Sequence, residues 1–394
     1  MPGFEVIGAE EQAEVDDVFA HGGVLMRHAF DAQRGDCYKV REFEAAFASA
    51  MGSPHALAVT SGTAALRVAL AALGIGPGDE VITQSFTFVA TVEAIIESGA
   101  TPVCTEIDAT FNLDPEDLQR RITDRTKAVI AVHMLGTPAR LPQIEAVCRD
   151  RNLVLIEDTA WGCGGSLAGR PLGTWGAIGT FSFDFAKTMT TGEGGMVVFQ
   201  DKEHYDLAAA WHDHGHENNP AVPRWEDTRS SSGFNYRMME LQGAVGLAQL
   251  RKLPGVVEAQ RANRTLLWNA IRDLEGVTAR EVPEGAMETA DGLVFTVADR
   301  ATALRCRATL LARGVSTKIL PEATTWHFAG DWTHMPQLVA AHGGDLDGVF
   351  SASRRLLERA VSLPVTVNMV ASVPQTVREA IVEALSTVEE GTVA

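Results

Sequence analysis

Three short stretches of this 394-residue chain carry residues whose types and spacing suit a small charged ligand. The first is "VTSGTAAL", residues 59–66, in which Ser61, Gly62 and Thr63 separate an apolar run from an alanine-rich helical pattern. Backbone N–H groups at the start of a helix, joined by hydroxyls, form a site that suits phosphate. A simple N-cap is the alternative, because Ser and Thr are preferred at that position.

The second stretch is "LVLIEDTAWG", in which Glu157 and Asp158 end a run with the character of a central strand. An acidic residue at a buried strand end costs several kcal/mol unless it meets a partner. A protonated ring nitrogen would be such a partner. The alternative is a carboxylate that caps the turn after the strand.

The third stretch is "FSFDFAKTMTTGEGGMVV", which sets Lys187 between an apolar run and a series of threonines and glycines. A lysine whose pKa is lowered by its surroundings can form a Schiff base with a carbonyl group. The glycines that follow allow the backbone to approach a ligand closely. The alternative is a loop lysine that faces solvent.

The elements expected around these stretches would bring them together. Between residues 56 and 200, seven short β-rich runs alternate with helical patterns, which predicts a doubly wound α/β fold with a mostly parallel seven-stranded sheet. Ligands bind such sheets outside the carboxyl ends of the strands, where all three stretches begin. Pyridoxal phosphate needs an anion cradle, an acid for its ring nitrogen and a Schiff-base lysine. The sequence therefore predicts this cofactor.

Two further segments suggest the domain organisation. The polar connection 212–235 is long for a compact domain, and the stretch 237–253 after it has apolar residues at helical spacing. Helix and strand signals then continue to the end of the chain. We expect an N-terminal segment and large cofactor-binding domain over 1–250, and a small C-terminal α/β domain over 251–394.

Composition excludes several classes of partner. The net charge is −18, from 51 acidic and 33 basic residues, and no block of like charge concentrates it, which argues against nucleic-acid and anionic-membrane partners. Five scattered cysteines without CxxC spacing predict neither a disulfide framework nor a metal site. No apolar run reaches membrane-spanning length and the first residues lack an apolar signal region, so we expect a soluble, cytoplasmic protein.

An ordered set of motifs resembles the DegT–StrS family of sugar aminotransferases, within the fold-type I enzymes that use pyridoxal phosphate. The likeness spans nearly the whole chain. The motifs are "TSGTAAL", "GIGPGDEVIT", "FTFVAT", "RTKAVIAVHMLG", "LIEDTAWGCGG", "TTGEGGMVV" and "GFNYRMMELQGAVGLAQL".

The resemblance implies roles for individual residues. Lys187 would carry the cofactor as an internal aldimine and Asp158 would pair with the pyridinium nitrogen. Phe88 would stack on the pyridine face, although an aromatic in an apolar run is otherwise core. The residues implied to hold the phosphate are Gly62, Thr63 and Ser182.

The same resemblance implies a homodimer. Asn235 of "GFNYRM" would reach the phosphate bound by the neighbouring subunit, so that the two active sites are shared between subunits. Such a role would explain the long connection that precedes it.

Two positions depart from the family pattern. Trp161 stands where the family usually has a glutamine, whose amide bonds the oxygen of the cofactor ring, whereas an indole offers a single N–H donor and more bulk. Trp161 either replaces that donor or reshapes the substrate pocket. In addition, "SFDFAKTM" lacks the proline often found just before the lysine.

A narrower resemblance is to the subgroup that aminates an eight-carbon keto-deoxy sugar acid to 8-amino-3,8-dideoxy-manno-octulosonate. It rests on "MPGFE", "FDAQRGDCYKVREFE", "SFDFAKT", "DHGHE" and "WHFAGDWTHM". On this analogy His214, His216 and His327 would lie near the substrate or the donor carboxylate; the alternative for each is an ordinary surface or core histidine. Another polyhydroxylated, nucleoside or antibiotic-type acceptor is also consistent with the sequence.

The expected activity is a ping-pong transamination. L-glutamate or L-glutamine would convert the cofactor on Lys187 to pyridoxamine phosphate, which would then aminate a keto or aldehyde group of a sugar-like acceptor, with Lys187 as general base. One alternative is sugar dehydration or deoxygenation on the same cofactor, but family members of that kind tend to replace the lysine with histidine. A cofactor-binding regulatory protein is the non-enzyme alternative, and it would not need Lys187.

Overall fold

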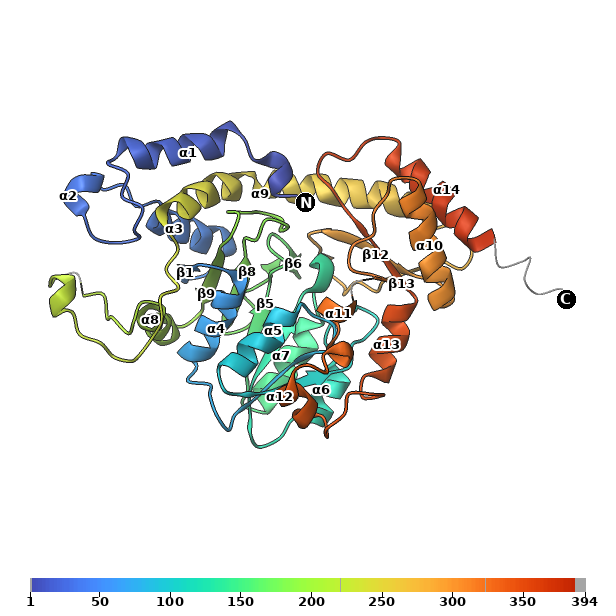
Figure 1. The fold of residues 1–394 in the computed structure, drawn as a ribbon, viewed down its shortest axis with the longest axis horizontal. Coiled ribbons are helices and arrows are strands. Elements are labelled where there is room, and N and C mark those ends of the chain that lie inside the picture. Colours follow the sequence, from blue (N-terminus) through green and yellow to red (C-terminus); the bar gives the residue numbers. More distant parts are fainter. Residues whose placement is uncertain (1, 220, 323, 387–394) are drawn as a thin grey trace.

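The structure is a computed structural model that describes residues 2–219, 221–322 and 324–386. A seven-stranded sheet forms its centre, and two three-stranded sheets lie beside it (Figure 1). The strands are β1 His55–Val59, β2 Glu80–Gln84, β3 Thr101–Thr105, β4 Thr126–Val132, β5 Val154–Asp158, β6 Ser166–Leu167, β7 Arg170–Pro171, β8 Ile178–Ser182, β9 Gly195–Phe199, β10 Thr278–Ala279, β11 Ala286–Met287, β12 Gly292–Thr296 and β13 Ala360–Pro364.

Helices surround these sheets on both faces. They are α1 Ala9–Ala20, α2 Asp31–Arg34, α3 Lys39–Met51, α4 Gly62–Ala72, α5 Val89–Glu97, α6 Pro115–Arg121, α7 Leu141–Asp150, α8 Lys202–Trp211, α9 Glu240–Ile271, α10 Arg300–Ala312, α11 Thr324–His327, α12 Pro336–Ala341, α13 Ser351–Glu358 and α14 Val373–Ser386.

The central sheet has the order β1-β9-β8-β5-β4-β2-β3. Only β9 runs against its neighbours β1 and β8, while the pairs from β8 to β3 are parallel. The predicted doubly wound, mostly parallel sheet of seven strands is therefore confirmed. As a result, the carboxyl ends of six strands lie along one edge.

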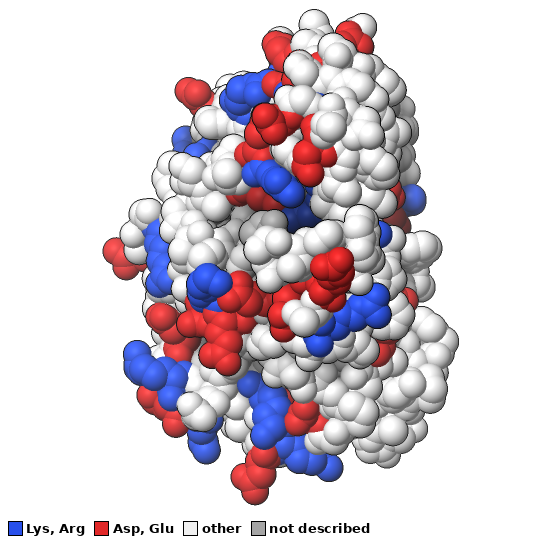
Figure 2. Space-filling view, turned by 90° about the vertical axis from the view of Figure 1, so that its left-hand side faces the viewer, with Lys and Arg blue, Asp and Glu red and all other residues white. Residues whose placement is uncertain are grey.

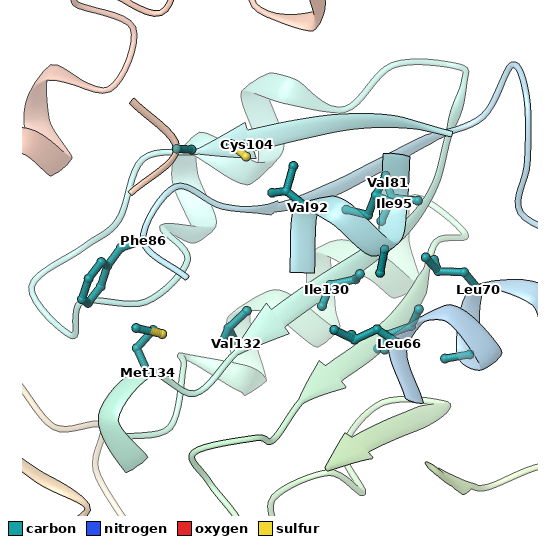
Figure 3. Packing of buried hydrophobic residues seen from close by; sticks show 14 of the residues in the cluster. Leu66, Leu70, Val81, Phe86, Val92, Ile95, Cys104, Ile130, Val132 and Met134 are labelled. Atoms are coloured by element: carbon teal, nitrogen blue, oxygen red, sulfur yellow. The ribbon is translucent and has the colours of Figure 1, made fainter. Parts of the chain in front are cut away.

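The strands of this sheet are buried because they carry apolar side chains on both faces. In β4, Ile130 and Val132 pack with α4 and α5 in one core cluster, whereas Val129 and Ala131 pack with α7 in another. Figure 3 shows the first cluster, with Ile130 and Val132 facing side chains of α4 and α5. The alternation follows from the two-residue period of a strand, and it explains why the runs read as almost continuously apolar.

Helix α9 joins the central sheet to the C-terminal region. Leu247 and Leu253 in its first half pack in the core formed with α3, whereas Leu267 and Ile271 pack against β12, β13, α10 and α14. The helix is longer than the predicted 237–253 and continues past Pro254. The expected division at residue 250 falls inside this continuous helix, so it stays a proposal about domain limits.

The N-terminal segment crosses the loop that carries the predicted Schiff-base lysine. The Gly3 N–H donates to the Lys187 carbonyl at 3.0 Å, and a Cβ on Gly3 would meet the Met189 backbone at 2.9 Å. The Asn368 N–H donates to the Glu5 carboxylate at 2.9 Å. The segment thus ties the lysine loop to the C-terminal region.

Surface charges agree with the sequence pattern. On the face shown in Figure 2, basic and acidic residues are interspersed among uncharged ones. All five cysteines are free, and four of them are buried. Among the described helices, none is both long and apolar enough to span a bilayer.

Candidate active site

The carboxyl edge of the central sheet forms one wall of a cavity of about 350 Å³. Its lining includes most of the residues singled out in the sequence, namely Gly62, Thr63, Phe88, Asp158, Trp161, Ser182, Lys187 and His327. Side chains that the sequence did not single out also line it, among them Thr87, Thr91, Thr180, Asp184 and Glu193. The three chemistry-bearing stretches therefore meet in one place.

The end of this cavity that is predicted to bind an anion is built at the start of α4. The Ser61 hydroxyl accepts the Ala64 N–H at 3.1 Å, so the predicted N-cap is present. Gly62 lies against the end of β8, where a Cβ would come within 2.7 Å of the Ser182 Cβ. This close approach brings the helix start and the Ser182 hydroxyl together around one small volume, as a phosphate cradle requires.

Asp158 ends β5 with its carboxylate on the cavity side. The Thr91 hydroxyl donates to Oδ2 at 2.9 Å and the Ala160 N–H donates to Oδ1 at 3.2 Å. Burial raises the pKa of Asp158, while these two hydrogen bonds and the nearby Lys187 charge lower it. The carboxylate thus caps the following turn and also faces the cavity, while its pairing with a ring nitrogen stays a prediction.

Glu157 points to the opposite face of the sheet. The N–H groups of Gly173 and Gly176 donate to its carboxylate, both at 2.8 Å, and His133 Nε2 lies 3.1 Å from it. Because the Ala139 N–H donates to His133 Nδ1 at 3.2 Å, the Nε2 atom carries the proton of a neutral ring. Glu157 is therefore a structural residue, and Asp158 alone of this pair faces the cavity.

Lys187 lies in the tight loop between β8 and β9. Its N–H donates to the Asp184 carbonyl at 3.0 Å, and its Nζ lies 3.5 Å from the centre of the Trp161 ring. Burial lowers the pKa of Lys187 to about 8, against the opposing charges of Asp291 and Asp158. The amine therefore faces a ring in a cavity instead of solvent, and it becomes a free base close to neutral pH, as a Schiff-base lysine requires.

Phe88 and His327 line the cavity and the exposed Trp326 lies beside Phe88; we call these three side chains the mouth of the cavity. The Phe88 ring, 36% exposed, lies 6.3 Å from the Trp326 ring at an interplanar angle of 22°, and 5.5 Å from the His327 ring. The Thr87 N–H donates to the His327 carbonyl at 3.0 Å. Phe88 is thus a cavity-wall residue and not an ordinary core aromatic.

Three predicted residues do not line the cavity within one chain. His214 and Asn235 are exposed on the long connection, and Asn235 Oδ1 accepts the Arg237 N–H at 3.3 Å. His216 is buried, with Nδ1 3.1 Å from the Asp227 carboxylate. Their assignment to a substrate or cofactor site stays a prediction, and it requires a second subunit.

We call the segments after position 288 that pack against Trp161 and Phe88 the second wall. His327 lines the cavity, whereas Asp291 and Lys318 lie behind Trp161, a placement that sequence reasoning missed. The Thr289 hydroxyl donates to the Trp161 carbonyl at 3.0 Å. Lys318 Nζ lies 4.8 Å from the centre of the Trp161 ring and is ion-paired with Asp291. Asp291 directly precedes β12, but no local pattern relates an acid there to a lysine more than 100 residues earlier.

Comparison with known proteins identifies the family. Residues 12–382 match the profile of the DegT/DnrJ/EryC1/StrS aminotransferase family. The chain belongs to this family.

Individual relatives cover parts of the chain. It is 45% identical over 214 residues to a GDP-perosamine synthase of Caulobacter vibrioides, covering 54% of this chain and 56% of that protein. It is 39% identical over 259 residues to the 3-amino-5-hydroxybenzoate synthase of Amycolatopsis mediterranei, covering 64% of each. The chain thus spans less than two thirds of the length of most of the curated relatives that it matches.

Solved structures match over almost the full length. The aminotransferase TlmJ from Streptoalloteichus hindustanus aligns with a TM-score of 0.83 and 28% identity, covering 97% of this chain and 98% of that one. A 3-amino-5-hydroxybenzoic acid synthase aligns with a TM-score of 0.81 and 28% identity over 97% of each chain. These matches confirm the expected fold type.

Proposed function

We propose that the protein is a pyridoxal-phosphate-dependent aminotransferase that moves an amino group from L-glutamate or L-glutamine to the carbonyl of a sugar or sugar-like acceptor. The observation that carries the proposal is the amine of Lys187, whose pKa is lowered to about 8, in one cavity with the buried carboxylate of Asp158. Membership of an aminotransferase family supports it independently.

The cavity fits the proposed cofactor. Its volume of about 350 Å³ lies within the range of small-molecule sites, and the Gly62 and Ser182 cradle leaves no room for a Cβ at position 62. Gly62, Thr63 and Ser182 would hold the phosphate, Asp158 the ring nitrogen and Phe88 one ring face. When bound, the cofactor supplies an electron-withdrawing ring that stabilises negative charge on the reacting carbon.

The chain's own residues orient the reactants and move the proton. Thr91 and Ala160 hold the Asp158 carboxylate in one orientation, so its charge faces the cavity at a fixed position. The Lys187 amine would take the proton from the α-carbon of the donor, because a base with a pKa near the working pH transfers protons most efficiently. The Trp161 ring would hold the resulting ammonium group against its face.

Dehydration, deoxygenation and regulatory binding are weaker alternatives. Both a dehydratase that keeps its cofactor noncovalently and a regulatory protein could work without a free amine at this place. The partly buried lysine over Trp161 therefore favours amino transfer.

For the acceptor, we propose a keto or aldehyde group on a sugar or related polyhydroxylated compound. Relatives named GDP-perosamine synthase and dTDP-4-dehydro-2,3,6-trideoxy-D-glucose 4-aminotransferase support an acceptor of this class. The eight-carbon sugar acid suggested by the narrower motif resemblance is one candidate within it.

We also propose a homodimer with shared sites. The connection that carries His214 and Asn235 projects away from the central sheet (Figure 1), and neither residue lines the cavity of its own chain. Mixed dimers of Lys187→Ala and Asn235→Ala subunits should regain activity, because one of their two sites would be intact. Verified mixed dimers without activity would refute the sharing.

Borohydride reduction tests the cofactor assignment directly. Reduction of the protein with pyridoxal phosphate should attach the cofactor to Lys187, as read by peptide mass, and L-glutamate should prevent the attachment by converting the cofactor to its amine. Lys187→Ala should lose amino transfer by up to about 10⁴-fold. Attachment at another lysine, or full activity of the Ala variant, would contradict the proposal.

A further inference from the structure

Two lysine ammonium groups from distant parts of the chain lie over the Trp161 ring. Lys187 Nζ and Lys318 Nζ lie 3.5 Å and 4.8 Å from its centre. Both distances lie within the reach of a cation–π interaction. Two positive charges over one ring repel each other, so the arrangement needs a negative charge close by.

Asp291 supplies that charge from the C-terminal region. Its side chain is 1% exposed and forms an ion pair with Lys318 through Oδ2, while no donor among the described residues reaches Oδ1. A buried carboxylate oxygen without a hydrogen bond is unfavourable unless another charge compensates it. Lys187 is such a charge, because Asp291 is the charged group that most strongly raises its pKa against burial.

We propose that Asp291 and Lys318 form a positioning pair that acts with Trp161 to hold the Lys187 amine and to set the pH at which it becomes a free base. The proposal rests on the proposed function only in taking Lys187 as the reactive amine. Neither Asp291 nor Lys318 is among the residues that line the cavity, so the pair acts through Trp161 and through its charge. Trp161 then has a role of its own at the position where the family usually has a glutamine.

The Asp291–Lys318 pair is held in place by the three-stranded sheet of β10, β12 and β13. Lys318 is held by its N–H, which donates to the Ser362 carbonyl of β13 at 2.8 Å, and Asp291 precedes β12 in the same three-stranded sheet. The pKa of the Lys187 amine should therefore depend on the position of this sheet. The other titratable groups that face Lys187 or share its cavity are Asp158, Asp184, Glu193 and His327.

The test uses the full-length chain without cofactor. A limiting amount of a lysine-selective acylating reagent is added from about pH 6 to pH 10, and labelling of the Lys187 peptide is measured by mass spectrometry. Asp291→Asn should lower the labelling pKa of Lys187 by about 0.5–1 pH unit, because a compensating charge is lost. Lys318→Met should raise it by a similar amount, because a repelling charge is lost and Asp291 becomes free for Lys187.

Two controls accompany these variants. Asp291→Asn with Lys318→Met removes both charges and should return the labelling pKa close to that of the parent. Glu80→Gln removes a buried carboxylate that is paired with Arg125 at the opposite end of β2, and it should leave the Lys187 profile unchanged.

Opposite shifts in the two single variants are the signature of the pair, since a structural disturbance would not reverse sign. Shifts in the same direction, or no larger than that of Glu80→Gln, would overturn the proposal. If Asp291→Asn does not fold, Lys318→Met decides alone, and an unchanged or lowered labelling pKa overturns it. Borohydride attachment of pyridoxal phosphate at Lys187 is measured separately, so failure of the cofactor assignment is distinguishable from failure of the pair.

Discussion

The two walls of the cavity differ in how the chain builds them. The first wall consists of residues at or shortly after the carboxyl ends of strands in one mostly parallel sheet, such as Gly62, Asp158 and Lys187. The second wall, with Asp291 and Lys318 behind it, comes from chain segments that pack against the first from more than 100 residues away. On the proposed function, the first wall would hold the groups that bind and react, and the second would adjust their charge and access.

This difference leads to an expectation about mutations. Changes in the first wall should alter cofactor retention or the reaction itself, because they touch the groups that do the chemistry. Changes in the second wall should alter pH dependence or acceptor binding while leaving the cofactor in place. The following variants test that separation.

Among the variants that test this separation, Asp158→Asn should have the largest effect. The amide keeps the size of the side chain: its Oδ1 can still accept the Ala160 N–H, and its Nδ2 can donate to the Thr91 hydroxyl. It removes the negative charge that would pair with the protonated ring nitrogen. We expect turnover to fall by about 10²- to 10³-fold. Glu157→Gln, next to it on the opposite face of the sheet, should instead lower stability, because Gly173, Gly176 and His133 would lose a carboxylate acceptor. Equal loss of turnover in folded proteins of both kinds would contradict the assignment of Asp158.

Gly62→Ala should come next. Its Cβ would lie 2.7 Å from the Ser182 Cβ, so the start of α4 must move away from β8. Overpacking of this kind costs about 1–3 kcal/mol, and here it would appear as weaker retention of pyridoxal phosphate, measured by equilibrium dialysis. Gly255→Ala in α9, where a Cβ meets nothing within 4 Å, is the control. Unchanged retention in Gly62→Ala would argue against a phosphate at this helix start.

Much of the first wall could be predicted because local pattern and sheet geometry act together. Seven β-rich runs indicated the strands, and parallel strands bring their carboxyl ends to one edge. Local sequence pattern alone could not decide whether Glu157 or Asp158 faces the cavity. That choice depends on the pleat of β5, because successive side chains point to opposite faces and only the packed sheet shows which face holds the cavity.

The charged pair behind the second wall could not be predicted, because its position depends on tertiary packing and not on local pattern. The ion pair between Asp291 and Lys318 depends on how the β12 and β13 sheet sits against Trp161, and tertiary packing decides that position. The role of Trp161 was left open between a donor and a bulky wall. In the structure, the face of its ring contacts the ammonium groups of Lys187 and Lys318. This contact could not be predicted without knowing where both lysines lie.

Stability of the cofactor-free chain gives a third test, centred on the amine between the walls. The pKa of Lys187 is lowered from 10.5 to about 8 in the fold, so below pH 8 the folded chain holds a charge that burial disfavours. That destabilisation is fully present below pH 8 and is lost as the pH rises to 10.5, where the unfolded lysine also becomes neutral. Lys187→Met should therefore raise the melting temperature at pH 7 by a few degrees, and the gain should shrink above pH 8.

The exposed Lys127 is the matched control for this measurement. Lys127→Met should change stability by no more than about 0.5 kcal/mol, as surface substitutions usually do. A gain in Lys187→Met that is independent of pH would show that added apolar packing, and not the removed charge, is responsible.

The smallest effect is expected at the mouth, from Trp326→Ala. The indole is 62% exposed and lies nearly parallel to Phe88, so it limits how far the Phe88 ring can swing from the cavity. Loss of this contact is worth about 0.5–1.5 kcal/mol, which predicts a several-fold rise in KM for the acceptor with little change in cofactor retention. The control is Trp225, which is 84% exposed on the long connection. Trp225→Ala should leave the KM for the acceptor unchanged, unless this connection covers the cavity mouth of the partner subunit. A loss of cofactor in Trp326→Ala as large as that in Gly62→Ala would contradict the separation of the two walls. A residue of the second wall would then hold the cofactor, which is assigned to the first wall.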